Sequence, residues 1–332
     1  MQDHLSYIKD ILGTHLGATL LSSRRVSQGH SGFVYVTDVA LDGVDGSLVV
    51  KLNRMHGTAS IETESVDARV YAGHSAGLEA VHRLLTLHRI PTYRLLAHGR
   101  PTSDLPYVWH VMTCLPGLSV RAHMAYAKGV DLEPLHKVAG EALGKLHTIS
   151  RPYDGKIDQT QPYALSWQRA FFQSVRHKLN NVVNLDLPWF GHLANRIAQI
   201  IDDTERIWRP PSAFVLSDMN GLQGMAQYAD GDWTFTGHID LEDYRFRDPR
   251  MVLAGCEVSL EFEGRQAPPA FWQGYRRFKE VESDYDKIRD VLKLYFLLEW
   301  LPYVYEADWR GNPSDREAVV QKFRTAISKL LG

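Results

Sequence analysis

Alternating hydrophobic and polar residues predict that the first third of the chain is rich in β-structure. A short amphipathic helix is expected over residues 4–19, where apolar side chains recur at helical spacing. Residues 25–37 then read as a glycine-containing turn that runs into an alternating strand. Asp-Gly pairs at 42–43 and 45–46 are typical of tight turns. Together these features predict an antiparallel meander with Lys51 on its third strand.

The pattern changes to a mainly helical one in the second part of the chain. A helix is expected over residues 78–85 and a further strand over residues 107–112. The segment Leu115-Pro116-Gly117 breaks this pattern, and apolar residues at helical spacing dominate after it. We therefore predict an N-terminal domain over residues 1–116 and a helical C-terminal domain over residues 117–332.

Composition narrows the class of protein. A chain of 332 residues is long enough for two domains of ordinary size. Its net charge of −2 argues against broad nucleic-acid binding, which needs a strong basic field. The only two cysteines, Cys114 and Cys256, are far apart and suggest neither a disulfide framework nor a zinc site. With no apolar run long enough to span a bilayer, we expect a cytoplasmic protein without a membrane or nucleic-acid partner.

Two aspartates follow short apolar strands in the second part of the chain. Residues 214–216 lead to Asp218, and residues 237–239 lead to Asp240. We expect these two short strands to be neighbours, so that their carboxylates can converge on one point. Phosphoryl transfer needs one carboxylate that orients the accepting hydroxyl and another that holds Mg²⁺. A turn or helix-cap role is the alternative for both, and Asp248, which precedes a proline, is interpreted as a helix cap.

The turn before the second strand contains Gly29, Ser31 and Gly32. Glycines at such a turn let backbone N–H groups approach phosphates closely. The simpler interpretation, a plain hairpin turn, remains open on this evidence.

Lys51 lies on a strand that is expected to be buried, so its ammonium needs a partner. Glu79, near the start of the predicted helix, is the first choice. Glu62 and Glu64 compete with it, because the connection between strand and helix is long. A strand-edge lysine that points to solvent is the alternative.

The order of these features resembles that in the aminoglycoside phosphotransferase family of kinase-like enzymes. Residues 107–117 look like the hinge of that family, and residues 142–147 look like the helix before its catalytic region. Residues 239–243, with Asp-Pro at 248–249, look like its metal-binding motif. The similarity covers roughly residues 20–300.

This resemblance implies an α+β, two-lobed protein-kinase-like fold with an N-terminal antiparallel β lobe and a larger, mainly helical C-terminal lobe. It also implies that ATP binds between the lobes, with Mg²⁺ held by Gln223 and Asp240 and the acceptor hydroxyl oriented by Asp218. The implied nucleotide-binding residues come from the turn, the strand, the helix and the hinge: Gly29, Ser31, Gly32, Lys51, Glu79, Met112 and Cys114.

The catalytic loop departs from the family pattern. The family reads His-Gly-Asp followed by Asn five residues later, whereas this chain reads Leu216-Ser217-Asp218 with Gln223 at the later position. Asn220 is a second candidate metal ligand at a different spacing.

The resulting prediction is an ATP-dependent kinase for a hydroxyl of a small molecule, such as a natural product or antibiotic, or of a peptide Ser or Thr. A partner protein is expected in the peptide case. The alternative is a nucleotide-binding pseudokinase or scaffold.

Overall fold

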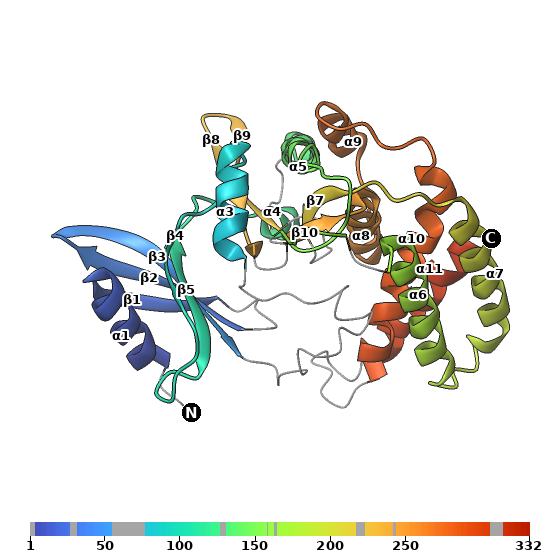
Figure 1. The fold of residues 1–332 in the computed structure, drawn as a ribbon, viewed down its shortest axis with the longest axis horizontal. Coiled ribbons are helices and arrows are strands. Elements are labelled where there is room, and N and C mark those ends of the chain that lie inside the picture. Colours follow the sequence, from blue (N-terminus) through green and yellow to red (C-terminus); the bar gives the residue numbers. More distant parts are fainter. Residues whose placement is uncertain are drawn as a thin grey trace.

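The computed structural model describes most of the chain: residues 4–26, 32–54, 77–126, 131–157, 159–162, 165–216, 223–241, 244–305 and 315–332. Within these residues an antiparallel sheet and a larger group of helices lie at opposite ends of the molecule, and small sheets lie between them (Figure 1). The predicted α+β arrangement, with a β-rich N-terminal part and a helical C-terminal part, is confirmed.

The N-terminal sheet has the strand order β1-β2-β3-β5-β4. Its elements are α1 (His4–Leu16), β1 (Thr19–Val26), β2 (Gly32–Leu41), β3 (Val44–Arg54), β4 (Leu95–Gly99) and β5 (Tyr107–Thr113). Helix α1 buries Ile8, Ile11 and Leu12 in one apolar cluster with Val50 and Leu52 of β3. This burial explains why the amphipathic pattern at the start of the chain forms a helix.

The turn between β2 and β3 lies at Asp42-Gly43, as predicted. Both residues have positive φ, 51° and 77°, which suits the two-residue hairpin turn that matches strand twist. The prediction of a second turn at Asp45-Gly46 is wrong, because these residues pair with Ala40 and Val39 inside the hairpin. Once Leu41 pairs with Val44, the ladder continues without interruption.

Helix α3 (Leu78–Leu87) follows the meander, and it confirms the helix predicted over residues 78–85. Its buried side chains, Leu78, Val81 and Leu85, belong to the large apolar cluster of the C-terminal part. The cluster inside the N-terminal sheet does not include them. Helix α3 is thus packed as an extension of the helical part of the molecule.

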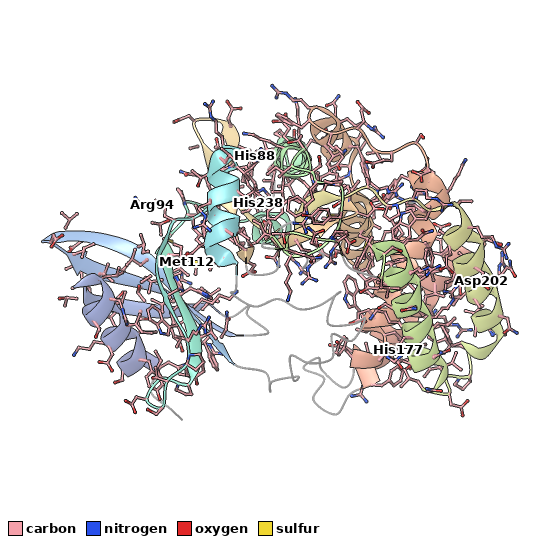
Figure 2. The ribbon with its side chains drawn as sticks, viewed as in Figure 1. His88, Arg94, Met112, His177, Asp202 and His238 are labelled. Carbon is pink, nitrogen blue, oxygen red and sulfur yellow. The ribbon has the colours of Figure 1, made fainter. Side chains whose placement is uncertain are left out.

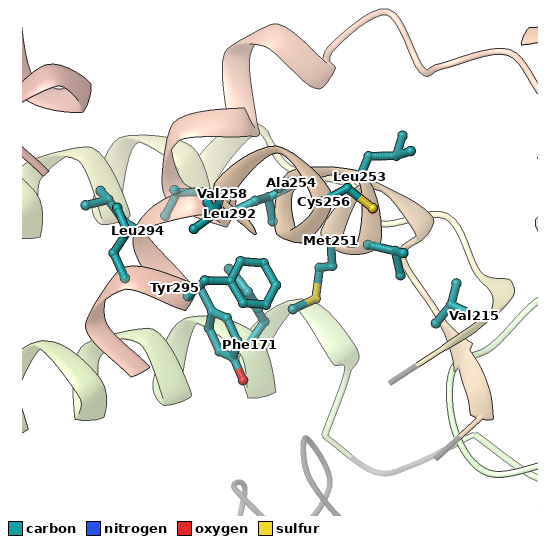
Figure 3. Packing of buried hydrophobic residues seen from close by; sticks show 14 of the residues in the cluster. Phe171, Val215, Met251, Leu253, Ala254, Cys256, Val258, Leu292, Leu294 and Tyr295 are labelled. Carbon is teal, nitrogen blue, oxygen red and sulfur yellow. The ribbon is translucent and has the colours of Figure 1, made fainter. Parts of the chain in front are cut away.

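The helical part carries the main core. Its helices are α4 (Val120–Tyr126), α5 (Glu133–Leu146), α6 (Trp167–Val183), α7 (Gly191–Ile207), α8 (Pro249–Phe262), α9 (Pro269–Arg276), α10 (Tyr285–Trp300), the 3₁₀ helix η2 (Pro302–Tyr305) and α11 (Arg316–Leu331). Figure 3 shows Phe171 of α6, Met251 of α8 and Tyr295 of α10 within this core. The rings of Phe171 and Tyr295 stack with centroids 5.2 Å apart. Among the described helices, none has the length and apolar character that crossing a membrane requires.

Two small sheets position the predicted catalytic segments. Their strands are β6 (Leu118–Ser119), β7 (Ala213–Leu216), β8 (Gly224–Ala229), β9 (Asp232–His238) and β10 (Tyr244–Arg247). Strands β6, β8 and β9 form one sheet, and β7 pairs with β10.

The expectation that the strands before Asp218 and Asp240 are neighbours in a sheet is wrong. The neighbour of β7 is β10, which follows Asp240 in the chain, whereas β9 pairs with β8. The chain changes direction at Asp240, where φ is 56°.

Candidate functional site

An ion pair joins the N-terminal sheet to the segment between β9 and β10. The Nζ atom of Lys51 lies 2.7 Å from Oδ1 of Asp240. Lys51 is on β3, opposite Val34 of β2 and His110 of β5, so both neighbouring strands fix its position. The lysine side chain is 11% exposed and the aspartate side chain 37%. The structure therefore brings together two predicted site residues that are 189 positions apart.

Asp240 is held in an uncommon backbone conformation. Its φ of 56° is in the left-handed region, where a residue other than glycine costs of order 1–3 kcal/mol. The preceding residues fix this geometry, because the His238 N–H donates to Pro91 O at 2.9 Å and the Ile239 N–H donates to Gln223 O at 3.1 Å. Asp42 has a similar φ in the turn between β2 and β3, so this conformation shows where the chain turns.

Gly237 allows the close approach behind this segment. Its φ is 157°, and a Cβ atom there would lie 2.9 Å from the Cα atom of Thr92. A side chain at this position would push β9 away from the connection that precedes β4. The glycine thus contributes to the position of Asp240.

Gln223 and Asp240 provide oxygen donors of the kind that Mg²⁺ prefers. The backbone hydrogen bond between Ile239 and Gln223 makes the two predicted ligands neighbours along the start of β8 and the end of β9. Among the described residues there is no group of three or more His, Cys, Asp or Glu side chains suited to a metal ion. Magnesium in phosphoryl-transfer enzymes is held by one or two protein ligands together with substrate phosphates, so this donor set fits it.

The structure contradicts the predicted pairing of Lys51 with Glu79. Glu79 Oε1 lies 3.0 Å from Nε2 of His98 on β4, and both side chains are exposed. His98 and Lys51 are both paired with His110 in the sheet, so Glu79 contacts the same face of the sheet as Lys51, but its partner there is His98. The competing candidates Glu62 and Glu64 lie outside the described residues.

The predicted hinge residues lie at the end of β5 and directly after it. Met112 is buried and pairs with Val49 and Leu95. The Cys114 side chain is exposed to solvent. The protein atoms around its thiol still exclude part of the water, and this desolvation raises the pKa of the thiol. Cys256, inside the helical core, is fully buried, and burial raises its pKa to about 12.

Of the turn predicted to bind phosphates, the structure describes only the last residue, Gly32. A Cβ atom there would lie 2.4 Å from Oδ1 of Asn53 and 2.7 Å from the backbone oxygen of Leu52, so β2 and β3 approach too closely for a side chain. Gly29, Ser31, Asp218 and Asn220 lie outside the described residues.

Asp248 is the buried N-cap of α8, as predicted. Its carboxylate accepts from the Arg250 backbone N–H at 2.9 Å, from the Arg250 guanidinium at 2.7 Å and from Trp208 Nε1 at 2.7 Å. The Arg250 guanidinium also contacts Asp284. Burial raises the pKa of Asp248, and the bonds from Arg250 oppose that rise. The sequence offered no signal for Trp208 and Arg250, because they meet Asp248 only through tertiary packing.

Carboxylates on α8 are paired with cations of α10. Lys293 Nζ lies 2.6 Å from Glu257 Oε2 and 2.8 Å from Glu261 Oε1. On the neighbouring helix pair, Lys178 of α6 contacts Glu299 of α10. These side chains are mostly buried, so the helical core contains charges that already neutralise one another.

Comparisons with known proteins agree with this architecture. The family model described as "Phosphotransferase enzyme family" matches residues 24–291. A search of curated proteins finds no match.

Solved structures resemble the chain over nearly its full length. Aminoglycoside 2′-phosphotransferase-IIIa, in its GDP complex, superposes with a TM-score of 0.64 at 12% identity, covering 99% of both chains. Spectinomycin phosphotransferase APH(9)-Ia, in complex with ADP and spectinomycin, gives 0.60 at 13% identity, covering 98% of this chain and 97% of the other. A thermostable mutant of aminoglycoside phosphotransferase APH(4)-Ia, with AMP-PNP and hygromycin B, gives 0.59 at 12% identity and 98% coverage of both chains.

Proposed function

We propose that this chain, which belongs to the phosphotransferase enzyme family, transfers the γ-phosphate of ATP to a hydroxyl group of a small molecule. Membership makes the protein a kinase-type phosphotransferase. The observation that carries the proposal is the ion pair between Lys51 and Asp240, which places a cation and a carboxylate from opposite parts of the molecule 2.7 Å apart. The nucleotide complexes of similar proteins support the choice of nucleotide donor.

In this proposal Lys51 exchanges its partner when nucleotide arrives. Lys51, now paired with Asp240, would hold the α- and β-phosphates, and Asp240 and Gln223 would then hold Mg²⁺. When bound, the metal neutralises charge on the phosphates.

Asp218 is proposed to orient the acceptor hydroxyl and to accept its proton. Asp218 follows β7 in the chain, and Asp240 precedes β10. Because β7 pairs with β10, this strand pair connects the segments that contain the two aspartates. Met112 and Cys114 would border the base, and Gly29, Ser31 and Gly32 would line the phosphates. Because the transition state is loose, positioning and charge neutralisation supply most of the rate.

A natural product or antibiotic is the proposed acceptor. The complexes of similar proteins with hygromycin B and with spectinomycin support a small molecule. Both cysteines are free, which supports a reducing compartment such as the cytoplasm.

A two-step experiment tests the function. Millimolar ATP or GTP with Mg²⁺ should first raise the melting temperature, because a ligand that binds only the native state stabilises it. Nucleoside diphosphate release is then screened over neutral and cationic hydroxyl compounds and over Ser- and Thr-containing peptides. Turnover on a peptide alone would replace the small-molecule acceptor, and binding without any turnover would favour a nucleotide-binding scaffold.

The Asp218→Asn variant tests the mechanism on the acceptor found. It keeps the size of the side chain and removes its charge, so nucleotide binding should remain while transfer falls by roughly 10²-fold or more. Full transfer activity in this variant would overturn the proposed mechanism.

A further inference from the structure

An open groove lies between α3 and β4, outside the site described above. It encloses a cavity of about 780 Å³ whose walls include Glu79, His82 and Arg83 from α3, His98 from β4, and Arg89 and Arg94 from the connection between them. A cavity of this size is in the usual range for small-molecule sites. The groove is therefore large enough for a ligand of its own.

The groove is positively charged, although the chain as a whole has a net charge of −2. The side chains of Arg83, Arg89 and Arg94 are exposed, and in the structure none of these three described residues has a hydrogen-bond or ion-pair partner for its guanidinium. One carboxylate, Glu79, also belongs to the wall, and it contacts His98. Three arginines and one glutamate therefore line the groove, and positive charge is in excess there.

The backbone fixes two of these arginines in place. Arg89 follows α3 in a left-handed conformation, with a φ of 53°, and its carbonyl accepts from Lys145 Nζ at 3.0 Å. The Arg94 N–H donates to Thr113 Oγ1 at 2.9 Å, and its carbonyl accepts from the Thr113 N–H at 3.0 Å. Both positions are anchored to other elements through backbone atoms, so the spacing of the two main-chain positions is set before a ligand binds.

The groove is also connected to the segment that contains Asp240. Pro91 and Thr92 belong to its wall, and Pro91 O accepts from the His238 N–H at 2.9 Å while Thr92 Oγ1 donates to His238 O at 3.0 Å. His238 comes two residues before Asp240. Figure 2 labels Arg94 and His238 on either side of α3. A ligand that shifts Pro91 and Thr92 would shift the end of β9.

We propose that this groove is a second ligand site, which binds a small anion carrying several phosphate groups and thereby alters nucleotide affinity at the Lys51–Asp240 site. Guanidinium groups bind phosphate oxygens through paired, charge-assisted hydrogen bonds. Three of them beside a single carboxylate leave an excess of positive charge, which matches an anion with several negative charges. The ends of β9 and β5 carry the effect, since both are hydrogen-bonded to the wall of the groove.

Binding is tested with inorganic tripolyphosphate by isothermal titration calorimetry, without nucleotide or Mg²⁺. Arg94→Gln should weaken binding at the groove by roughly tenfold or more, the range expected for a lost hydrogen bond between charged groups. Arg324→Gln, which removes a similarly exposed arginine on α11, is the matched control and should leave binding unchanged. A combined Arg83→Gln, Arg89→Gln and Arg94→Gln variant should abolish the groove contribution, and its melting temperature checks the fold.

Three results would overturn the proposal. The first is equal tripolyphosphate affinity in the native and triple-variant proteins, which would place all binding elsewhere, as at the nucleotide site. The second is equal affinity for citrate and tripolyphosphate, which would refute the phosphate assignment. The third is an effect of tripolyphosphate on nucleotide affinity, at fixed free Mg²⁺, that is the same in both proteins, because simple competition at Lys51 produces that outcome. The effect on nucleotide affinity rests on the proposed function, whereas anion binding in the groove does not. Tripolyphosphate binding that is lost in the triple variant, in a protein that binds no nucleotide, would therefore overturn the proposed function and the coupling while supporting the second site.

Discussion

Asp240 and Asp248 belong to one short segment of the chain, yet they lie in opposite environments. Asp240 is 37% exposed, has a strained backbone and meets a lysine from the other end of the molecule. Asp248 is fully buried, caps a helix and is surrounded by Trp208 and Arg250. The first environment leaves the carboxylate free to change partners, and the second prevents it. The same residue type therefore serves ligand exchange in one place and architecture in the other.

The largest expected effect is on stability. Asp248→Asn removes one partner of a buried ion pair and leaves Arg250 without most of its compensation, so the free energy of unfolding should fall by about 3–5 kcal/mol. The identical change at Asp240 removes half of a partly exposed pair and should cost about 1 kcal/mol or less. Urea denaturation of both variants measures the difference, and equal losses would contradict the comparison.

Activity should show the reverse order. Asp240→Asn keeps a residue that tolerates the left-handed backbone, but it removes the charge that holds Mg²⁺. The rate should fall by roughly 10²–10³-fold, the scale found when one preorganised electrostatic contact is lost. Steady-state kinetics over a range of Mg²⁺ concentrations measures it. At a temperature where the Asp248→Asn variant is still folded, it should retain near-native turnover. A loss of turnover as large as that of Asp240→Asn would contradict the separation of catalytic and structural roles.

Acid should act on buried groups next to the Asp240 segment. Desolvation lowers the pKa of His238 to about 4 and that of His147 to about 3, from an ordinary value of 6.5. Between pH 6.5 and 4 these histidines are therefore protonated in the unfolded chain but largely neutral in the folded one. The free energy of unfolding falls as the pH falls through this range. Each histidine contributes up to about 1.4 kcal/mol per pH unit.

Urea denaturation at pH 7, 6 and 5 follows this loss. His147→Gln should make the pH dependence shallower, and an unchanged slope in that variant would assign the acid sensitivity to other groups.

The smallest effect is expected at Glu79. Its bond to His98 is exposed and Lys51 is paired with Asp240, so Glu79→Gln should change stability by less than about 0.5 kcal/mol and leave nucleotide affinity essentially unchanged. Lys51→Met, in contrast, should abolish most of the thermal stabilisation by nucleotide and Mg²⁺. A Glu79→Gln defect as large as that of Lys51→Met would mean that the helix changes position when nucleotide binds.

Local patterns in the sequence predicted the elements that depend on neighbouring residues. The strand that carries Lys51, the hinge strand and the helix at residues 78–85 follow from alternation and helical spacing, and the Asp248 cap follows from the Asp-Pro pair. The two aspartates were assigned to neighbouring strands because nothing local indicates that the chain turns at Asp240.

Pairings between residues far apart in the chain could not be predicted from the sequence in the same way. The partner of Glu79 depends on how α3 rotates its apolar face into the C-terminal core, and a single helical pattern does not specify which polar strand lies opposite. Likewise, Lys293 and Glu257 come from helices whose contact arises only in the folded core. The sequence could nominate the charged residues at these positions, whereas the choice of partner depended on tertiary packing.

The contrast between the chain's two cysteines provides a built-in site for chemical labelling. Cys114 is exposed beside the predicted nucleotide pocket. Cys256 is buried in the helical core, and burial raises the pKa of its thiol to about 12. A maleimide dye at moderately alkaline pH should therefore modify the native protein once, at the hinge. The resulting fluorophore would report nucleotide arrival and departure in real time, without any engineered mutation.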